Sequence, residues 1–129
     1  MTTTILLIED NEQNRYLATF LLEGCGYAVA HAANGPDGIA LAARCQPALI
    51  LLDIQLPLMD GYAVARALRA MPALTAVPIV AVTSYAMAGD RERILVAGCN
   101  GYLEKPINPE TFVADVARHL PTAPPARAP

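Results

Sequence analysis

Short runs of consecutive apolar residues alternate along this chain with longer stretches of mixed apolar and polar residues. Three strong runs lie at residues 5–8, 49–52 and 79–82, and two weaker ones at 27–30 and 101–103. The runs are continuous rather than alternating, which is typical of strands in a parallel sheet covered on both faces. The pattern therefore predicts five buried strands.

Apolar residues at helical spacing occupy the stretches between these runs. The residues that share a predicted helix face are Leu17 and Leu21 in the first stretch, Val64, Leu68 and Met71 in the third, Met87, Arg91, Ile94, Leu95 and Gly98 in the fourth, and Phe112, Val116 and Leu120 in the last. The second stretch, 36–44, is rich in alanine and begins with a proline, which suits the first turn of a helix. This alternation predicts βαβ crossovers and an α/β fold in which helices cover both faces of one parallel sheet.

The composition is that of one folded domain. The chain has 129 residues, of which 54% are hydrophobic and 16% charged, and its net charge is −3. It has too many apolar residues for a disordered chain and no basic excess for non-specific binding to nucleic acid. We expect one domain over residues 1–120, a flexible Pro- and Ala-rich tail over 121–129, and no output domain.

Targeting and cysteine signals are weak in this chain. No apolar run approaches the ~20 residues of a membrane span, and the start lacks the basic and apolar regions of a signal peptide. We therefore expect a cytoplasmic protein without membrane insertion. The cysteines Cys25, Cys45 and Cys99 are widely spaced and form no C-x-x-C motif, so buried free thiols are expected rather than zinc ligands or disulfides.

Polar and charged side chains follow four of the predicted strands. They are Glu9 and Asp10 after the first run, Asp53 after the run at 49–52, Thr83 and Ser84 after the run at 79–82, and Lys105 just beyond the last run. The carboxyl ends of parallel strands share one edge of a sheet, and ligands bind in the crevice there. We therefore expect these side chains to converge.

Three carboxylates at one edge repel one another unless a cation lies among them. The donors are oxygens, with no His or Cys in the pattern, which favours Mg²⁺, with Mn²⁺ as a substitute, over zinc. An Asp at the end of a central strand is a suitable nucleophile toward phosphorus, and Lys105 suits an incoming phosphoryl oxygen. The pattern indicates phosphoryl transfer to Asp53.

Each of these residues also has a purely structural interpretation. Residues 9–11 suit a helix N-cap, Asp53 a turn at a strand end, Lys105 a solvated surface position and residues 83–84 a helix cap. All of these interpretations would have to hold together at the ends of different strands. A shared site explains the pattern with one cause.

The motifs at these positions resemble the receiver domain of two-component response regulators. The resemblance covers residues 5–120 and is carried by Glu9-Asp10-Asn11, Asp53-Ile54-Gln55-Leu56-Pro57, Met59-Asp60-Gly61, Thr83-Ser84 and Lys105-Pro106. Residues 83–90 and 98–102 are most similar to stand-alone cell-division receivers of the DivK type. The stretch that ends at Asn14 is also similar to receivers attached to hybrid sensor kinases. The resemblance implies a flavodoxin-like (βα)5 fold with strand order 2-1-3-4-5.

The resemblance also implies roles for the residues at the predicted edge. Asp53 would be the phosphoacceptor, taking a phosphoryl group from a phosphohistidine of a sensor histidine kinase or a histidine phosphotransfer protein. Asp10, Asp53 and the backbone carbonyl of Gln55 would bind Mg²⁺ directly, and Glu9 would act through water. Lys105 would contact the phosphoryl group.

Further residues would transmit the effect of phosphorylation to the protein surface. The resemblance implies that Thr83 turns its hydroxyl to the new phosphate, that Tyr102 follows inward, and that the bond before Pro106 is cis. Ser84 belongs to the same motif, and Tyr85 resembles a position that tunes access to the acyl phosphate. A downstream protein target would bind the fourth helix, fifth strand and fifth helix, and the chain would be a monomer or weak dimer.

The chain would then be a signalling protein rather than an enzyme, with self-phosphorylation from small donors and self-dephosphorylation. A haloacid-dehalogenase-like phosphohydrolase would need a second Asp where Gln55 stands. A flavodoxin-like FMN binder would need a Ser- or Gly-rich phosphate loop in place of Glu9-Asp10, and the P-loop motif is missing from the sequence. A receiver that signals by binding alone, without phosphorylation, is a further alternative.

Overall fold

Five parallel strands form the centre of the computed structural model, which describes residues 2–84 and 88–121. The strands are β1 (Thr4–Ile8), β2 (Ala28–Ala32), β3 (Leu49–Asp53), β4 (Ile79–Thr83) and β5 (Gly101–Glu104). Their spatial order is β2-β1-β3-β4-β5, and all four neighbouring pairs are parallel. The predicted flavodoxin-like topology with order 2-1-3-4-5 is confirmed.

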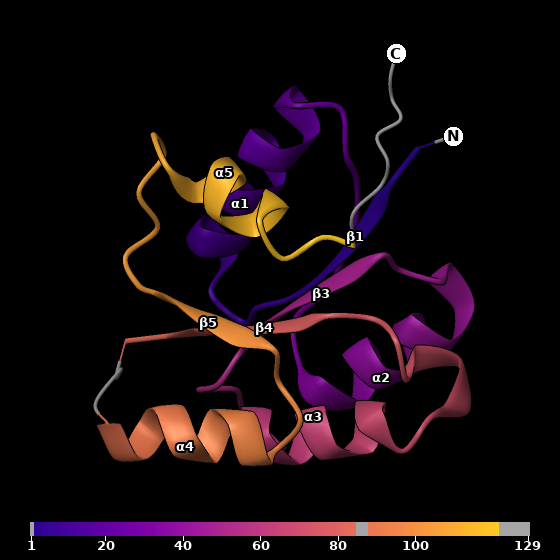
Figure 1. Cartoon of the computed structure of the whole chain (residues 1–129). Helices are drawn as coiled ribbons and strands as arrows, with labels where there is room; N and C mark the ends of the chain where they lie inside the picture. Colours follow the sequence, from indigo (N-terminus) through magenta and orange to yellow (C-terminus); the bar gives the residue numbers. More distant parts are fainter. Residues whose placement is uncertain (1, 85–87, 122–129) are drawn as a thin grey trace.

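Helices cover both faces of this sheet (Figure 1). One face carries α1 (Glu12–Gly24) and α5 (Phe112–Ala117), and the other carries α2 (Gly35–Cys45), α3 (Gly61–Arg69) and α4 (Ala88–Val96). A short 3-10 helix, η1 (Pro72–Leu74), precedes β4. In the described part of the chain, no helix has the length and apolar character needed to cross a membrane.

Two apolar layers hold the helices on the sheet. Leu6 and Ile50 pack toward α2, α3 and α4, whereas Ile5 and Leu49 face α1 and α5. All four are fully buried, so both faces of each central strand need apolar residues. This explains the continuous runs in the sequence, and each such side chain stabilises the fold by about 1.5–3 kcal/mol.

Two helices bury somewhat different faces from those predicted. In α1 the fully buried residues are Ala18 and Leu22, while Leu17 and Leu21 are half-buried. The small Ala18 lets the helix approach the sheet closely, and this shifts the contact line by one position.

In α4 Ile94 is buried as predicted, but Arg91 and Leu95 are exposed. The helix packs mainly beside β5, at the edge of the sheet, and therefore buries a narrow face. Met87 was also predicted on that face, and it lies outside the described residues.

The cysteines differ in part from expectation. All three are free, but only Cys99 is buried, Cys45 is half-buried and Cys25 is exposed. Cys25 caps the end of α1, where its N–H donates to the carbonyl of Leu22. The expectation of a buried thiol is wrong for Cys25 because this position follows the last turn of the helix, outside its packed face.

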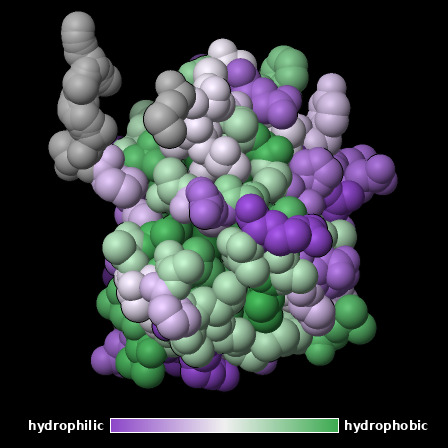
Figure 2. All heavy atoms as spheres, turned by 90° about the vertical axis from the view of Figure 1, so that its right-hand side faces the viewer, coloured by the Kyte–Doolittle hydropathy of each residue, from purple (hydrophilic) through white to green (hydrophobic). Residues whose placement is uncertain are grey.

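Many hydrophobic residues lie at the surface. Figure 2 views the molecule from the right-hand side of Figure 1, and hydrophobic side chains there are interspersed with hydrophilic ones. Several exposed residues of α2 and of the segment after α3 are alanines, among them Ala40, Ala43, Ala70 and Ala73. Much of the 54% hydrophobic content is therefore small and tolerated at the surface.

The loop between β3 and α3 contains an apolar residue in the left-handed backbone region. Leu58 has a φ of 70° and is 85% exposed. The N–H of Met59 donates to the Pro57 carbonyl at 2.7 Å, so Leu58 is the central residue of a tight γ-type turn. A side chain in this conformation costs about 1–2 kcal/mol relative to glycine.

Gly61 fastens the start of α3 to the end of β3. Its N–H donates to the Ile54 carbonyl at 2.9 Å, and a Cβ at this position would overlap Ile54 Cα and lie 2.7 Å from the Asp53 carbonyl oxygen. Asp60 caps the same helix by accepting from the Ala63 N–H at 2.9 Å. Only a glycine allows this close approach of backbone to backbone.

Replacing Gly61 should therefore destabilise the fold. Gly61→Ala forces a methyl group against backbone atoms that cannot rotate away, and we expect it to lower the free energy of unfolding by about 1–3 kcal/mol. The matched control is Gly24→Ala at the end of α1, where a Cβ would meet nothing within 4 Å. That control should be neutral or slightly stabilising. Urea unfolding of both variants tests this, and equal stabilities would contradict the close packing at Gly61.

Candidate functional site

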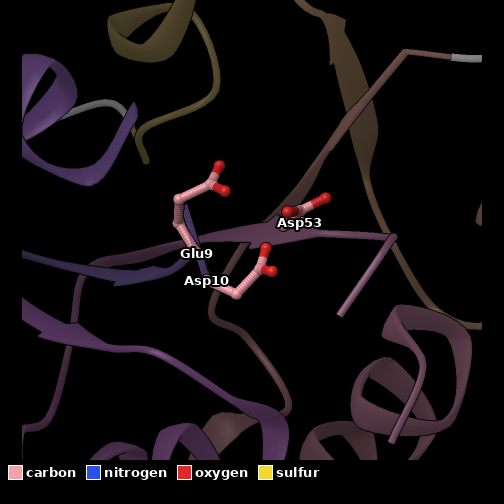
Figure 3. A group of neighbouring side chains, drawn as sticks. All are labelled: Glu9, Asp10 and Asp53. Atoms are coloured by element: carbon pink, nitrogen blue, oxygen red, sulfur yellow. The ribbon is translucent and has the colours of Figure 1, made fainter. Parts of the chain in front are cut away.

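Three carboxylates meet at the carboxyl-terminal edge of the sheet. Glu9 and Asp10 follow β1, Asp53 is the last residue of β3, and one oxygen from each lies within 4.8 Å of the others. Figure 3 shows the three side chains around a common space. Glu9 and Asp53 are buried, and Asp10 is exposed. The structure thus brings together residues that are remote in the sequence, as their strand-end positions predict.

Strand alternation explains how Lys105 joins this cluster. Glu9, Asp53 and Lys105 continue the odd-numbered positions of β1, β3 and β5, which face α1 and α5. Lys105 Nζ lies 3.0 Å from Asp53 Oδ2 and 3.5 Å from Glu9 Oε1. The ammonium is therefore placed between two buried carboxylates.

Asp53 is held through both of its oxygens. Oδ2 accepts from Lys105 Nζ, and Oδ1 accepts from the Gln55 N–H at 2.9 Å. The Lys105 N–H donates in turn to the Thr83 carbonyl at 2.9 Å, and the peptide bond between Lys105 and Pro106 is cis, as the resemblance implied. The carboxylate has a fixed orientation before any ligand binds.

Two ionisable partners of Asp53, the buried Glu9 and the half-buried Lys105, have displaced pKa values. Burial and the neighbouring charge of Asp53 raise the pKa of Glu9 to about 7, although the Asn11 N–H at 3.1 Å from Oε2 favours the ionised form. Burial lowers the pKa of Lys105, but its hydrogen bond to Asp53 and the two carboxylate charges outweigh this and leave the pKa raised. Burial and the neighbouring charges therefore set the pKa of both groups.

Thr83 and Ser84 stand at the neighbouring strand end. Thr83 is the last residue of β4 and is buried, whereas Ser84 is exposed. Thr83 and Gln55 line a hollow of about 360 Å³ that extends to Tyr62 of α3 and Arg93 of α4. Tyr85 lies outside the described residues.

Tyr102 lies in the middle of β5, opposite Ala81. Its side chain is half-buried against the apolar layer beneath α4, and the guanidinium carbon of Arg91 is 5.6 Å from its ring centroid. Tyr102 is therefore packed between the sheet and α4. Its role as a switch stays a prediction.

Two supports of the site were missed in the sequence. Arg15 Nη1 donates to the Glu9 carbonyl at 2.8 Å and to the Asp10 carbonyl at 3.4 Å, so it holds the loop that presents both carboxylates. A cation in the first turn of a helix is unfavourable next to the helix dipole. The unusual position of Arg15 was therefore the sequence signal that could have revealed this support. The N–H of Gln55 is the second support, and a backbone donor leaves no trace in the residue type.

The donor set of the cluster fits a hard divalent cation. Glu9, Asp10 and Asp53 offer carboxylate oxygens within 4.8 Å of one another, a spacing that one ion can bridge. If all three are ionised, three negative charges against the one positive charge of Lys105 leave a net charge of −2. Mg²⁺ matches both this charge and the oxygen ligands.

Comparison with known proteins agrees with this geometry. The sequence matches the response regulator receiver domain over residues 5–117. The polar-differentiation response regulator DivK of Brucella ovis is 39% identical over 120 residues, which cover 93% of this chain and 98% of that relative.

Solved structures place the chain in the same group. The chemotaxis protein CheY4 of Vibrio cholerae is 28% identical with a TM-score of 0.90, covering 93% of this chain and 100% of that chain. The receiver domain of a sensor histidine kinase from Pseudomonas aeruginosa, solved with a magnesium ion in its active-site cleft, is 38% identical with a TM-score of 0.84, covering 92% of this chain and 98% of that chain. This chain belongs to the response regulator receiver domain family of two-component signalling.

Proposed function

We propose that this receiver accepts a phosphoryl group onto Asp53 from a phosphohistidine of a sensor histidine kinase or a histidine phosphotransfer protein. The observation that carries the proposal is the setting of Asp53. It is 1% exposed, one oxygen lies 3.0 Å from Lys105 Nζ, and two further carboxylates stand beside it. A carboxylate held in this way at the end of a central strand is positioned as a nucleophile.

The proposed reaction is a direct displacement at phosphorus. An oxygen of Asp53 attacks, the phosphorus–nitrogen bond to the donor imidazole breaks, and that nitrogen keeps the electron pair and takes up a proton. Lys105 stays within reach of the phosphoryl oxygens and stabilises the charge that develops on them. The product is an acyl phosphate on Asp53.

The acidic cluster supplies the ligands for the metal in this proposal. Asp10, Asp53 and the backbone carbonyl of Gln55 would bind Mg²⁺, or Mn²⁺ in its place, and Glu9 would act through water. A bound divalent cation would neutralise charge between the carboxylates and the incoming phosphoryl group. The magnesium ion in the Pseudomonas aeruginosa receiver supports this assignment.

Phosphorylation would act as a switch by changing charge locally. The phosphoryl group carries about −1.5 to −2 charges and would lie beside the buried Thr83, whose hydroxyl would turn toward it. Tyr102 would follow, and its contact with Arg91 would carry the change to α4. A downstream protein would bind the surface of α4, β5 and α5.

The wider role follows from this switch. We propose that residues 1–120 act as a receiver whose output is protein binding rather than nucleic-acid binding, as a monomer or weak dimer in the cytoplasm. Slow self-phosphorylation from small donors and self-dephosphorylation would accompany it. Of the predicted tail over 121–129, residues 122–129 lie outside the described residues.

Phosphorylation should depend on Asp53 and on the metal. Incubation with acetyl phosphate and Mg²⁺ should give an acid-stable, base-labile phosphate, and Asp53→Asn or excess EDTA should abolish it. Asp60→Asn is the matched control in the same loop, because an asparagine still caps α3. Intact-protein mass spectrometry measures the product. Labelling that persists in Asp53→Asn, or is lost equally in Asp60→Asn, would refute the proposal.

Without Mg²⁺, Glu9 should make stability depend on pH. Its pKa rises from 4.5 in the unfolded chain to about 7 in the folded chain, so between these values the folded state holds a proton that the unfolded state releases. The free energy of unfolding should therefore fall by about 1–2 kcal/mol as pH rises through this window, allowing for solvent screening.

Urea unfolding in EDTA tests this near the two ends of the pH window. Glu9→Gln should lose that part of the pH dependence, while contributions from the histidines remain in both proteins. An identical pH dependence for wild type and Glu9→Gln would show that Glu9 does not hold the extra proton.

A further inference from the structure

One exposed apolar side chain lies in the loop that follows the candidate phosphoacceptor. Leu58 is 85% exposed at a φ of 70°, in the loop that starts directly after Asp53. We propose that Leu58 is a contact and specificity residue for the protein that delivers the phosphoryl group. This inference rests on the proposed function and names how the donor is recognised.

The turn around Leu58 is fixed from both sides. Leu56 and Met59 pack into the apolar layer of α2, α3 and α4, and the Met59 N–H donates to the Pro57 carbonyl at 2.7 Å. Met59 also lies tightly against the start of α2, because a Cβ on Gly35 would be 3.3 Å from Met59 Cβ. Leu58 is thus displayed on a rigid support, so little entropy is lost when a partner covers it.

Folding of this chain does not account for a leucine here. The side chain gains little from burial at 85% exposure, and its backbone conformation favours glycine. The other described residues with positive φ are Gly26, Gly98 and the polar Gln46 at the end of α2. Leu58 is the apolar exception among them, and an exposed apolar residue on a rigid support is typical of a protein interface.

The position of Leu58 favours a phosphodonor protein as the partner that covers it. Leu58 is three residues from Gly61, a span of at most ~11 Å, and Gly61 packs on the backbone of Ile54 and Asp53. A small phosphodonor needs only the polar cluster around Asp53. A protein that places a phosphohistidine over Asp53 covers ~800 Å² of the surrounding surface, a disc about 16 Å in radius. Leu58 falls within that footprint.

Two phosphodonors distinguish a role of Leu58 in protein docking from a role in the phosphorylation reaction itself. Purified sensor histidine kinases are autophosphorylated with ATP, and the one that labels the wild-type chain fastest is compared with acetyl phosphate. Leu58→Asn and Leu58→Gly should lower kcat/KM for transfer from the kinase by about tenfold or more and leave the acetyl phosphate rate within about twofold. Leu58→Gly should also raise the urea midpoint, because the backbone strain is relieved.

Val96→Asn is the matched control, since Val96 is an equally exposed apolar residue on α4. It should leave kinase transfer unchanged. Kinase transfer that survives both Leu58 variants, falls equally with Val96→Asn, or falls in step with acetyl phosphate labelling would overturn the inference. A chain that acetyl phosphate labels, but that neither a kinase nor a histidine phosphotransfer protein phosphorylated by a kinase labels, would also overturn it, because no protein donor would exist for Leu58. Failure of acetyl phosphate on the wild-type chain would instead refute the proposed function.

Discussion

Repulsion between buried carboxylates at one edge of the sheet is the constraint on which the site depends. Glu9 and Asp53 are nearly inaccessible to solvent, so their charges are poorly screened. Among the described residues, Lys105 is the cation that forms ion pairs with both. Lys105 reaches them because β5 lies beside β4 and its backbone is bonded to Thr83. The strand order therefore places the Lys105 ammonium beside the two buried carboxylates.

This imbalance links stability to function. The site holds three carboxylates against one ammonium, and burial together with the charge of Asp53 raises the pKa of Glu9. A divalent cation would offset the excess negative charge, and a phosphoryl group would then add negative charge close to that cation and to Lys105. A chain with only 16% charged residues thus concentrates several of them at one edge of the sheet, where a divalent cation would offset their repulsion.

Much of the site could be predicted from the sequence, because the ends of parallel strands determine which residues lie close together. The continuous runs before Asp53 and Thr83 predicted the buried strands, and the parallel topology placed their ends together. Other features depend on packing between distant segments. The buried face of α1 differs from the predicted one because Ala18 packs on the sheet. Cys25 is exposed because it follows the last turn of α1. The positive φ of Leu58 arises from local backbone geometry, which residue type alone does not encode, and the only sequence signal of the Arg15 support was a cation in the first turn of a helix.

We propose that the acidic edge is a magnesium site, which calorimetric titration with Mg²⁺ would test. Wild type should bind one ion per chain, and Asp10→Asn, which removes an exposed carboxylate of the cluster, should weaken binding by about tenfold or more. Asp60→Asn, outside the cluster, should bind as wild type does. Binding that is unchanged in Asp10→Asn, or that is weakened equally in Asp60→Asn, would contradict the account.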